Sequence, residues 1–254
     1  MAFLTEGHYK VRLTRRRRET LKRYVVVALA VLCAACANQQ AKFAPPEQMR
    51  KVAIIAIREP QQVIVANRSL GNIFNPIANM SEPGETKRNS EDYVRLMNQS
   101  RKSLATALAQ SLKDGLATRY EIVSIEQRPK LNSDGKTLDY SVIKTDADAI
   151  LHVFYGGTGY MVFREQTTYL PLFALGATLI DTRTHEPLYT KQFLVQPGSA
   201  WGDPREVLES DRRYSYPSAE DLLASFEESY KGLVETQQAI AQRIVADLTG
   251  NAGK

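Results

Sequence analysis

Short apolar runs after residue 50 predict the strands of a mixed sheet. The runs at 51–57 and 149–155 are nearly continuous, which is the pattern of central strands covered on both faces. Residues 62–66 extend or follow the first run, and residues 120–125 form another short run of the same kind. These runs are too short for helices of ordinary length and too regular for loops, so we expect strands at all four places.

A hairpin is predicted later in the chain. Residues 168–180 and 188–195 are two apolar runs, and the polar stretch 181–187 between them has the composition of a turn. Pro171 is expected to break the first of these strands, because proline has no backbone N–H for the ladder.

Two stretches show helical rather than strand periodicity. Residues 90–116 carry four leucines at a spacing of four, which makes one apolar stripe. Residues 218–250 carry a second stripe, with Ser218 as the predicted N-cap and Gly250 as the predicted end. A short helix is predicted at 138–144. Each long helix has a single apolar face, so both are expected to cover the same sheet.

The predicted fold class is α+β (α/β), a mixed β-sheet with two long amphipathic helices packed on it and one additional short helix. Residues 51–250 are expected to form a single domain. Residues 37–50 are polar and contain two adjacent prolines, which predicts a flexible tether. Residues 67–90 and 196–217 are predicted to be long loops, a class that is often functional.

The segment before the tether has the plan of a secretory signal peptide. Four arginines at 15–18 precede the apolar run Val25–Ala35, which ends at Cys36. This run is shorter than the roughly 20 residues that span a bilayer. Its end, Ala-Ala-Cys36, resembles the lipobox of bacterial lipoproteins, which implies that Cys36 is lipidated, with palmitate among its acyl groups. The lipobox usually has Leu where this chain has Cys33.

The export route stays open at this point. Residues 17–22 resemble the twin-arginine export motif, with Thr20 in place of its usual Phe, while general secretion fits the same segment. In the lipoprotein family, an Asp directly after the lipidated cysteine favours retention in the inner membrane. This chain has Ala37 there, so the resemblance implies the periplasmic face of the outer membrane.

The net charge of +5 belongs to the leader rather than to the domain. Eight of the 33 basic residues and two of the 28 acidic residues precede Cys36, so 25 basic and 26 acidic residues follow it. The part after Cys36 therefore has a net charge of −1, which does not favour nucleic-acid binding. Both cysteines lie in the leader, so we expect neither a disulfide nor a cysteine-based metal site after it.

No residue pattern in the domain predicts an enzyme, a metal site or a cofactor site. Gly156–Gly159 lacks the Lys-Ser/Thr of a phosphate-binding loop, so it is expected to turn the strand at 149–155 back through residues 160–163. His152 is expected to be a hydrogen-bonded core residue. Asp146 and Asp148 could act as an acid–base pair, but they fit a turn cap before the strand better.

The loop 196–217 is the stronger candidate for a partner-binding surface. It combines aromatic residues with arginines, the types enriched at interface hot spots. The candidate residues are Trp201, Arg205, Arg212, Arg213, Tyr214 and Tyr216. The alternative is that the aromatic side chains anchor the loop onto its own domain. The loop 67–90 is a second candidate contact surface.

The order of elements resembles a domain shared by the amino-terminal part of TolB, the curli secretion lipoprotein and the lipoprotein activators of penicillin-binding proteins. Four segments carry the resemblance: 51–57, the leucine helix with 120–124, Asp146–Val153, and Ala177–Tyr189. Relatives usually have Gly at the turn position of His185, a position that often needs positive φ. The resemblance implies a non-enzymatic part of an envelope machine and, because related channels form rings, allows a homo-oligomer.

The sequence therefore predicts an exported, lipid-anchored envelope protein that binds a protein partner in outer-membrane assembly, secretion or cell-wall synthesis. Two alternatives are an auxiliary lipoprotein of an inner-membrane transport system and a periplasmic hydrolase. Cys36 is the predicted lipidation site.

Overall fold

The computed structural model describes residues 46–67, 84–133, 135, 137–162, 167–196 and 205–250, all within one compact unit that spans residues 43–254. The predicted signal peptide with Cys33 and Cys36, most of the tether, and Trp201 lie outside the described residues. The predictions for those residues are therefore not examined by the structure.

One mixed sheet of seven strands forms the centre of the domain. Its strands are β1 (Lys51–Ile55), β2 (Ile64–Asn67), β3 (Glu121–Ile125), β6 (Ala149–Val162), β7 (Leu170–Asp181), β8 (Pro187–Gln196) and β9 (Glu206–Glu209). They run in the order β3-β1-β6-β7-β8-β9, and β2 pairs with β6. The hairpin strands β6, β7 and β8 are antiparallel, whereas β1, β2 and β3 join the sheet in parallel. A separate pair is formed by β4 (Lys130–Leu131) and β5 (Leu138–Asp139).

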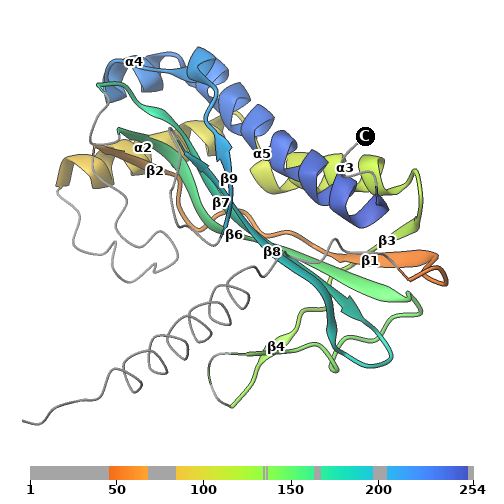
Figure 1. The fold of residues 1–254 in the computed structure, drawn as a ribbon. Coiled ribbons are helices and arrows are strands. Elements are labelled where there is room, and N and C mark those ends of the chain that lie inside the picture. The colour runs from red at the N-terminus through yellow and green to blue at the C-terminus, as the bar shows by residue number, and fades with distance from the viewer. Residues whose placement is uncertain are drawn as a thin grey trace, which may run out of the picture. The chain divides into compact units, whose positions relative to one another are not determined.

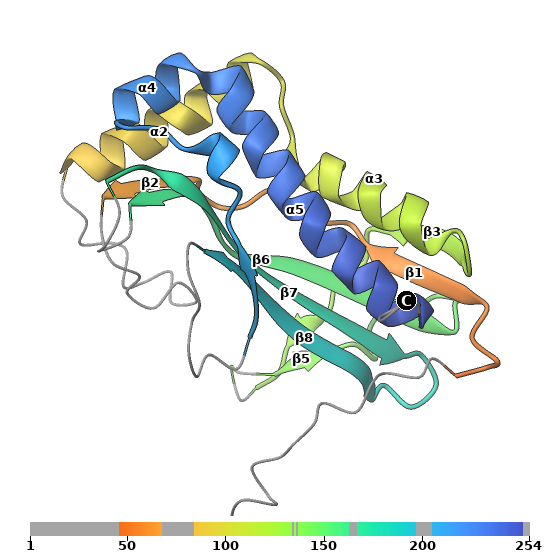
Figure 2. The ribbon, with the colours of Figure 1, turned by 45° about the horizontal axis from the view of Figure 1, so that its top comes forward.

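The helices lie together on one face of the sheet (Figure 1). They are α2 (Gly84–Gln99), α3 (Leu104–Leu116), α4 (Ala219–Ala224) and α5 (Phe226–Thr249), with a 3-10 turn η2 (Arg212–Tyr214). The β4–β5 pair lies on the opposite side of the sheet from α5, as both ribbon views show (Figures 1 and 2). The α+β fold class predicted from the sequence is confirmed.

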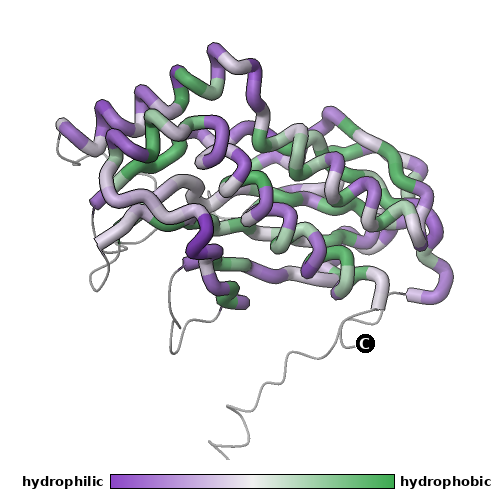
Figure 3. Tube along the Cα trace, turned by 90° about the horizontal axis from the view of Figure 1, so that it is seen from above, coloured by the Kyte–Doolittle hydropathy of each residue, from purple (hydrophilic) through white to green (hydrophobic). Residues whose placement is uncertain are grey.

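The main core lies between the sheet and the helices. It contains Val52 and Ile54 of β1 and the predicted leucine stripe of α3, together with one face of α5. In Figure 3 the helices alternate between hydrophilic and hydrophobic segments, as amphipathic helices do. A second cluster on the other face joins Ala53 and Ile55 to Ile143 and Ala147. β1 is thus covered on both faces, as its continuous apolar run predicted.

Two glycine positions explain why the prediction for residues 149–163 is wrong. We expected Gly156–Gly159 to turn the strand, but β6 runs through all four residues from Ala149 to Val162. The register against β7 shifts between Tyr155 and Gly157, so Gly156 is the extra residue of a β-bulge. Gly159 has φ +152, and a Cβ there would lie 1.9 Å from the Ile64 carbonyl oxygen. These glycines permit a bulge and a close strand contact rather than a turn.

Both long helices are divided, contrary to the prediction. The helix expected at 90–116 is α2 and α3, separated at Arg101, whose φ is +52, and Ser103, which caps α3 by accepting a hydrogen bond from Thr106 N at 3.0 Å. The side chain of a serine can compete with the helical backbone in this way. α2 also begins at Gly84, so residues 84–90 are helical and not part of a loop.

The second division is at Ser225, between α4 and α5. Ser218 caps α4 by accepting a hydrogen bond from Asp221 N at 3.0 Å, and Gly250 ends α5 with φ +77, so both predicted ends are confirmed. The described part of the predicted loop 196–217 contains β9 and η2.

Of three further predictions in and before the hairpin, two are wrong and one is confirmed. The short helix expected at 138–144 is wrong, because β5 and a turn occupy these residues, and Asp139 accepts hydrogen bonds from the Ser141 backbone and hydroxyl. The break expected at Pro171 is also wrong, since β7 continues through it. The hairpin itself is confirmed, and His185 has φ +60 in its turn.

Candidate functional site

The predicted partner-binding segment is described from Arg205 onward, and its aromatic residues belong to the core. Tyr214 is 1% exposed and packs where α5 has Gly232, since a Cβ there would lie 2.6 Å from the Tyr214 ring. Tyr216 stacks edge-on against Tyr160, with ring centroids 5.5 Å apart. Their rings contact their own domain, the alternative weighed from the sequence. Burial, followed by the nearby Glu235 carboxylate, raises the pKa of Tyr214 to about 12.

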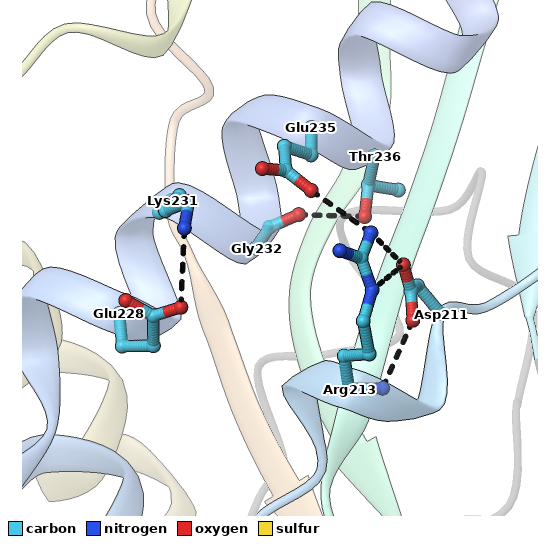
Figure 4. Close-up of polar contacts among 7 residues, drawn as sticks. All are labelled: Asp211, Arg213, Glu228, Lys231, Gly232, Glu235 and Thr236. Carbon is cyan, nitrogen blue, oxygen red and sulfur yellow. Dashed lines mark hydrogen bonds and ion pairs between the residues drawn. The ribbon is translucent and has the colours of Figure 1, made fainter.

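The arginines of the same segment remain at the surface. Arg213 is 72% exposed and lies between Asp211 and Glu235 of α5, as Figure 4 shows. Its hydrogen bonds hold the pKa of the Asp211 carboxyl below its usual value. Arg212 is 74% exposed and faces Glu209 at 3.9 Å. Partner binding by Arg205, Arg212 and Arg213 stays a prediction.

A cluster of ion pairs connects the start of this segment to β8 and α5. Glu206 of β9 pairs with Lys191 of β8 and with Arg243 of α5. Lys191 also contacts Asp247 of α5 at 2.8 Å. These ion pairs connect β8, β9 and α5 through side chains that are mostly buried, so the cluster stabilises the packing of the three elements.

Asp146 and Asp148 hold the beginning of β1. Asp148 accepts hydrogen bonds from the backbone N–H groups of Arg50 and Lys51 at 2.8 and 2.9 Å, and Asp146 pairs with the Lys51 ammonium at 2.8 Å. The two backbone hydrogen bonds lower the pKa of Asp148, and the Lys51 hydrogen bond lowers that of Asp146. Two lowered values do not suit a general acid near neutral pH.

An interruption in the sheet creates a pocket that the sequence did not predict. β1 pairs with β6 at residues 149–151, and β2 pairs with β6 at residues 159–162. Between these two points, residues 152–158 of β6 have no strand on this edge. Residues 56–63, which connect β1 to β2, do not pair with β6. A pocket of about 590 Å³ lies here, and we call it the gap pocket.

Residues from three segments line the gap pocket: Arg58, Glu59, Pro60, Gln61, Gln62 and Ile64, then Arg128, Pro129 and Leu138, and His152–Gly157 of β6. Its volume lies in the range of pockets that hold compact ligands, roughly 300–1,000 Å³. The only sequence signals for it were two glycines and a histidine in an apolar strand, and neither signal reveals that the strand lacks a neighbour.

The charges in the gap pocket are unevenly matched. The Glu59 carboxylate is directed to the start of α3, where it accepts hydrogen bonds from the Ser103 hydroxyl and from Ala105 N. Arg128 donates to the Ala56 carbonyl at 2.7 Å. Burial, followed by the positive charge of Arg58, lowers the pKa of Arg128. The nearby Glu126 carboxylate acts in the opposite sense. Because Arg58 and Arg128 line the pocket together with a single carboxylate, Glu59, the lining has a net positive charge that an anion would offset.

His152 lines the gap pocket, and its ring lies next to the rings of Tyr140 and Phe154. Its Nδ1 shares a hydrogen bond of 2.9 Å with the Tyr140 hydroxyl, and its ring centroid lies 5.5 Å from that of Phe154. Burial, and then Arg128, lower the pKa of His152 to about 4, so its ring is neutral at pH 7. The histidine is hydrogen-bonded, as expected. It faces the gap pocket, which was not expected.

Within the described ranges, no group of three or more His, Cys, Asp or Glu side chains is placed to hold a metal ion. None of the helices in the same ranges combines the length and apolar character needed to cross a membrane.

Comparison with known proteins gives only weak structural similarity. No known family and no curated protein matches the sequence. A crystal structure of a Xanthomonas campestris protein of the DUF330 family matches with a TM-score of 0.38 and 8% identity, over 83% of this chain and 95% of that one. The PelC dodecamer from Paraburkholderia phytofirmans matches with a TM-score of 0.35 and 10% identity, over 82% of this chain and 93% of that one.

A lipoprotein from Neisseria meningitidis matches with a TM-score of 0.27 and 9% identity, over 61% of this chain and 88% of that chain. These TM-scores and identities are too low to carry an argument about fold or function. The resemblance to the TolB group therefore stays a prediction.

Proposed function

We propose that this chain is an exported envelope lipoprotein, lipidated at Cys36, that acts as a non-enzymatic accessory or scaffold protein and binds a protein partner at the periplasmic face of the outer membrane. The partner would work in outer-membrane assembly, secretion or cell-wall synthesis. The observation that carries the proposal is the leader, in which four arginines precede an apolar run that ends at Ala-Ala-Cys36.

The rest of the sequence is compatible with separate roles for the lipid anchor, the tether and the domain. No cysteine follows Cys36, so lipidation there would leave the domain without thiols. Residues 37–50 would give the domain reach from the membrane. One acyl chain binds a membrane weakly, whereas two or more hold a protein stably. The three chains of mature bacterial lipoproteins, implied by resemblance, would thus anchor this domain.

Metabolic labelling with palmitate, followed by membrane fractionation, tests the anchor. We expect the wild-type protein to be labelled and to sediment with membranes, and Cys36→Ala to be unlabelled. Cys33→Ala is the matched control, because it removes the neighbouring thiol and should keep the label. Absence of label in the wild type, or a labelled Cys36→Ala variant, contradicts the proposal.

Membrane separation on a density gradient distinguishes the first alternative. The proposal places the labelled protein in the outer-membrane fraction. Recovery in the inner-membrane fraction would favour an auxiliary lipoprotein of a transport system instead.

A further inference from the structure

We propose that the gap pocket binds an extended peptide segment of a partner protein. The peptide backbone would pair with the open edge of β6, while an acidic side chain meets Arg58 and Arg128 and an apolar side chain packs on Leu138 and Phe154. This inference deepens the proposed function by naming the chemistry of the partner. Its test uses purified protein, so failed binding and failed lipidation are separate results.

The backbone of β6 provides the first argument. Seven consecutive residues, 152–158, have β7 on one side and no strand on the other. Among the described residues, no backbone hydrogen bond joins 57–63 to this edge. An open strand edge is a template for an added strand, and its backbone hydrogen bonds supply affinity without depending on sequence. Gly156 and Gly157 leave the middle of the edge free of side chains.

Charge provides the second argument, and it selects an acidic peptide. Two arginines and one carboxylate, Glu59, line the pocket, and Glu59 accepts its hydrogen bonds at the start of α3, so the lining keeps a net positive charge. Arg58 is exposed, and Arg128 lines the same pocket with the Glu126 carboxylate nearby. A guanidinium group binds a carboxylate with two parallel hydrogen bonds, which makes a Glu side chain a well-matched occupant.

Exposed apolar surface provides the third argument. Three large apolar side chains are notably exposed among the described residues: Leu131 at 61%, Phe154 at 39% and Leu138 at 38%. Two of them, Leu138 and Phe154, line the gap pocket, and Leu131 does not. In an extended peptide, residues two apart point to the same side. A Glu and a Leu separated by one residue could therefore reach the arginines and the apolar pair together.

Fluorescence anisotropy with a labelled peptide tests the proposal. The probe is an end-blocked peptide, Thr-Thr-Glu-Thr-Leu-Thr, in which threonine favours the extended state, and it is titrated with the full-length protein in mild detergent. We expect saturable binding. Replacing the Glu of the peptide by Gln should weaken binding about tenfold, because a charge-assisted hydrogen bond is lost. Replacing the Thr between Glu and Leu by Pro should weaken it by a similar factor, because a backbone hydrogen bond is lost.

Two pairs of protein variants locate the binding. Arg58→Gln and Leu138→Ser should each weaken binding about tenfold. Their matched controls are Arg95→Gln and Leu131→Ser, which change exposed residues of the same types outside the pocket and should bind within about twofold of wild type. Circular dichroism should be used to check that each of the four variants is folded.

Several results would overturn the proposal. The absence of saturable binding at millimolar peptide excludes a peptide site. Equal binding of the Gln peptide rejects the carboxylate, and equal binding of the Pro peptide rejects strand addition in favour of a small anionic ligand. Control variants that weaken binding as much as Arg58→Gln and Leu138→Ser would place the site elsewhere.

Discussion

The segments 205–217 and 152–158 differ in a way that their compositions conceal. The first is rich in aromatic residues and arginines, yet Tyr214 and Tyr216 are buried, and Glu206 and Arg213 are engaged in ion pairs with α5. The second is an apolar strand with glycines, yet one of its edges lacks a neighbouring strand and borders the gap pocket.

The difference shows that residue type is a poorer guide to a candidate binding surface than the pairing of the strands. An aromatic side chain stabilises the element on which it packs, which is α5 for Tyr214 and β6 for Tyr216. A strand edge becomes available only where its neighbour departs, and that departure depends on the path of residues 56–63. We therefore expect the first segment to matter for stability and the second for binding.

The largest expected effect is on the stability contributed by Tyr214. Tyr214→Ala should lower the free energy of unfolding by about 3–5 kcal/mol, because it empties a fully buried aromatic site. Phe154→Ala should lower it by only about 1 kcal/mol, since that ring is partly in water. Urea titrations followed by circular dichroism measure both. Equal losses for the two variants would remove the contrast between the segments.

A second variant acts on one end of the gap. Gly159→Ala should cost about 3 kcal/mol, because the new Cβ would collide with the main chain of β2 at Ile64. Gly84→Ala is the control, as no atom lies within 4 Å of a Cβ there and alanine suits the start of α2. The same urea titrations compare them. An unaffected Gly159→Ala would mean that the contact between β2 and β6 is not fixed as described.

The pH dependence of stability tests the burial of His152. Its pKa is lowered from 6.5 to about 4 in the folded protein, so the unfolded chain takes up a proton first as the pH falls. The free energy of unfolding should therefore fall by up to about 3 kcal/mol between pH 6.5 and pH 4. The carboxyl groups with lowered pKa values, such as Asp148, lose their contribution only below about pH 4.

His152→Gln should remove most of this slope, because glutamine does not titrate. Stability measured at intervals from pH 7 to pH 4 compares the variant with the wild type. An unchanged slope in His152→Gln would show that folding does not lower the pKa of His152 and that other groups cause the slope.

The smallest effect is expected for Arg213→Gln. The guanidinium is largely in water, where the desolvation and ordering of an ion pair nearly offset its attraction. The urea midpoint should stay within experimental error of wild type. A clear loss would show that the ion pairs of Arg213 help to hold η2 on α5, and 205–217 would then depend on charge as well as on its rings.

Much of the fold could be predicted because its signals are local. The continuous run at 51–57, the leucine stripe of α3, the Ser218 cap and the Gly250 end each depend on a few neighbouring residues. A competing side-chain bond accounts for the break at Ser103, which caps α3, whereas Ser225 makes no side-chain cap hydrogen bond at the start of α5. The apolar periodicity continues across both breaks, so periodicity alone could not show them.

The candidate site could not be predicted in the same way. Glycines at 156–159 fit a turn and a bulge equally well, and only the register against β7 decides between them. The meeting of Arg58 and Arg128 depends on segments 70 residues apart in sequence. The burial of Tyr214 depends on Gly232, whose missing side chain makes room for the ring.

The most direct test of the contrast is a titration of isotope-labelled full-length protein with the Thr-Thr-Glu-Thr-Leu-Thr peptide, followed by amide NMR shifts. We predict that the amides of Gly156 and Gly157 shift with added peptide while those of Arg212 and Arg213 stay in place. Shifts at Arg212 and Arg213 with none at Gly156 and Gly157 would contradict the account and return partner binding to segment 205–217.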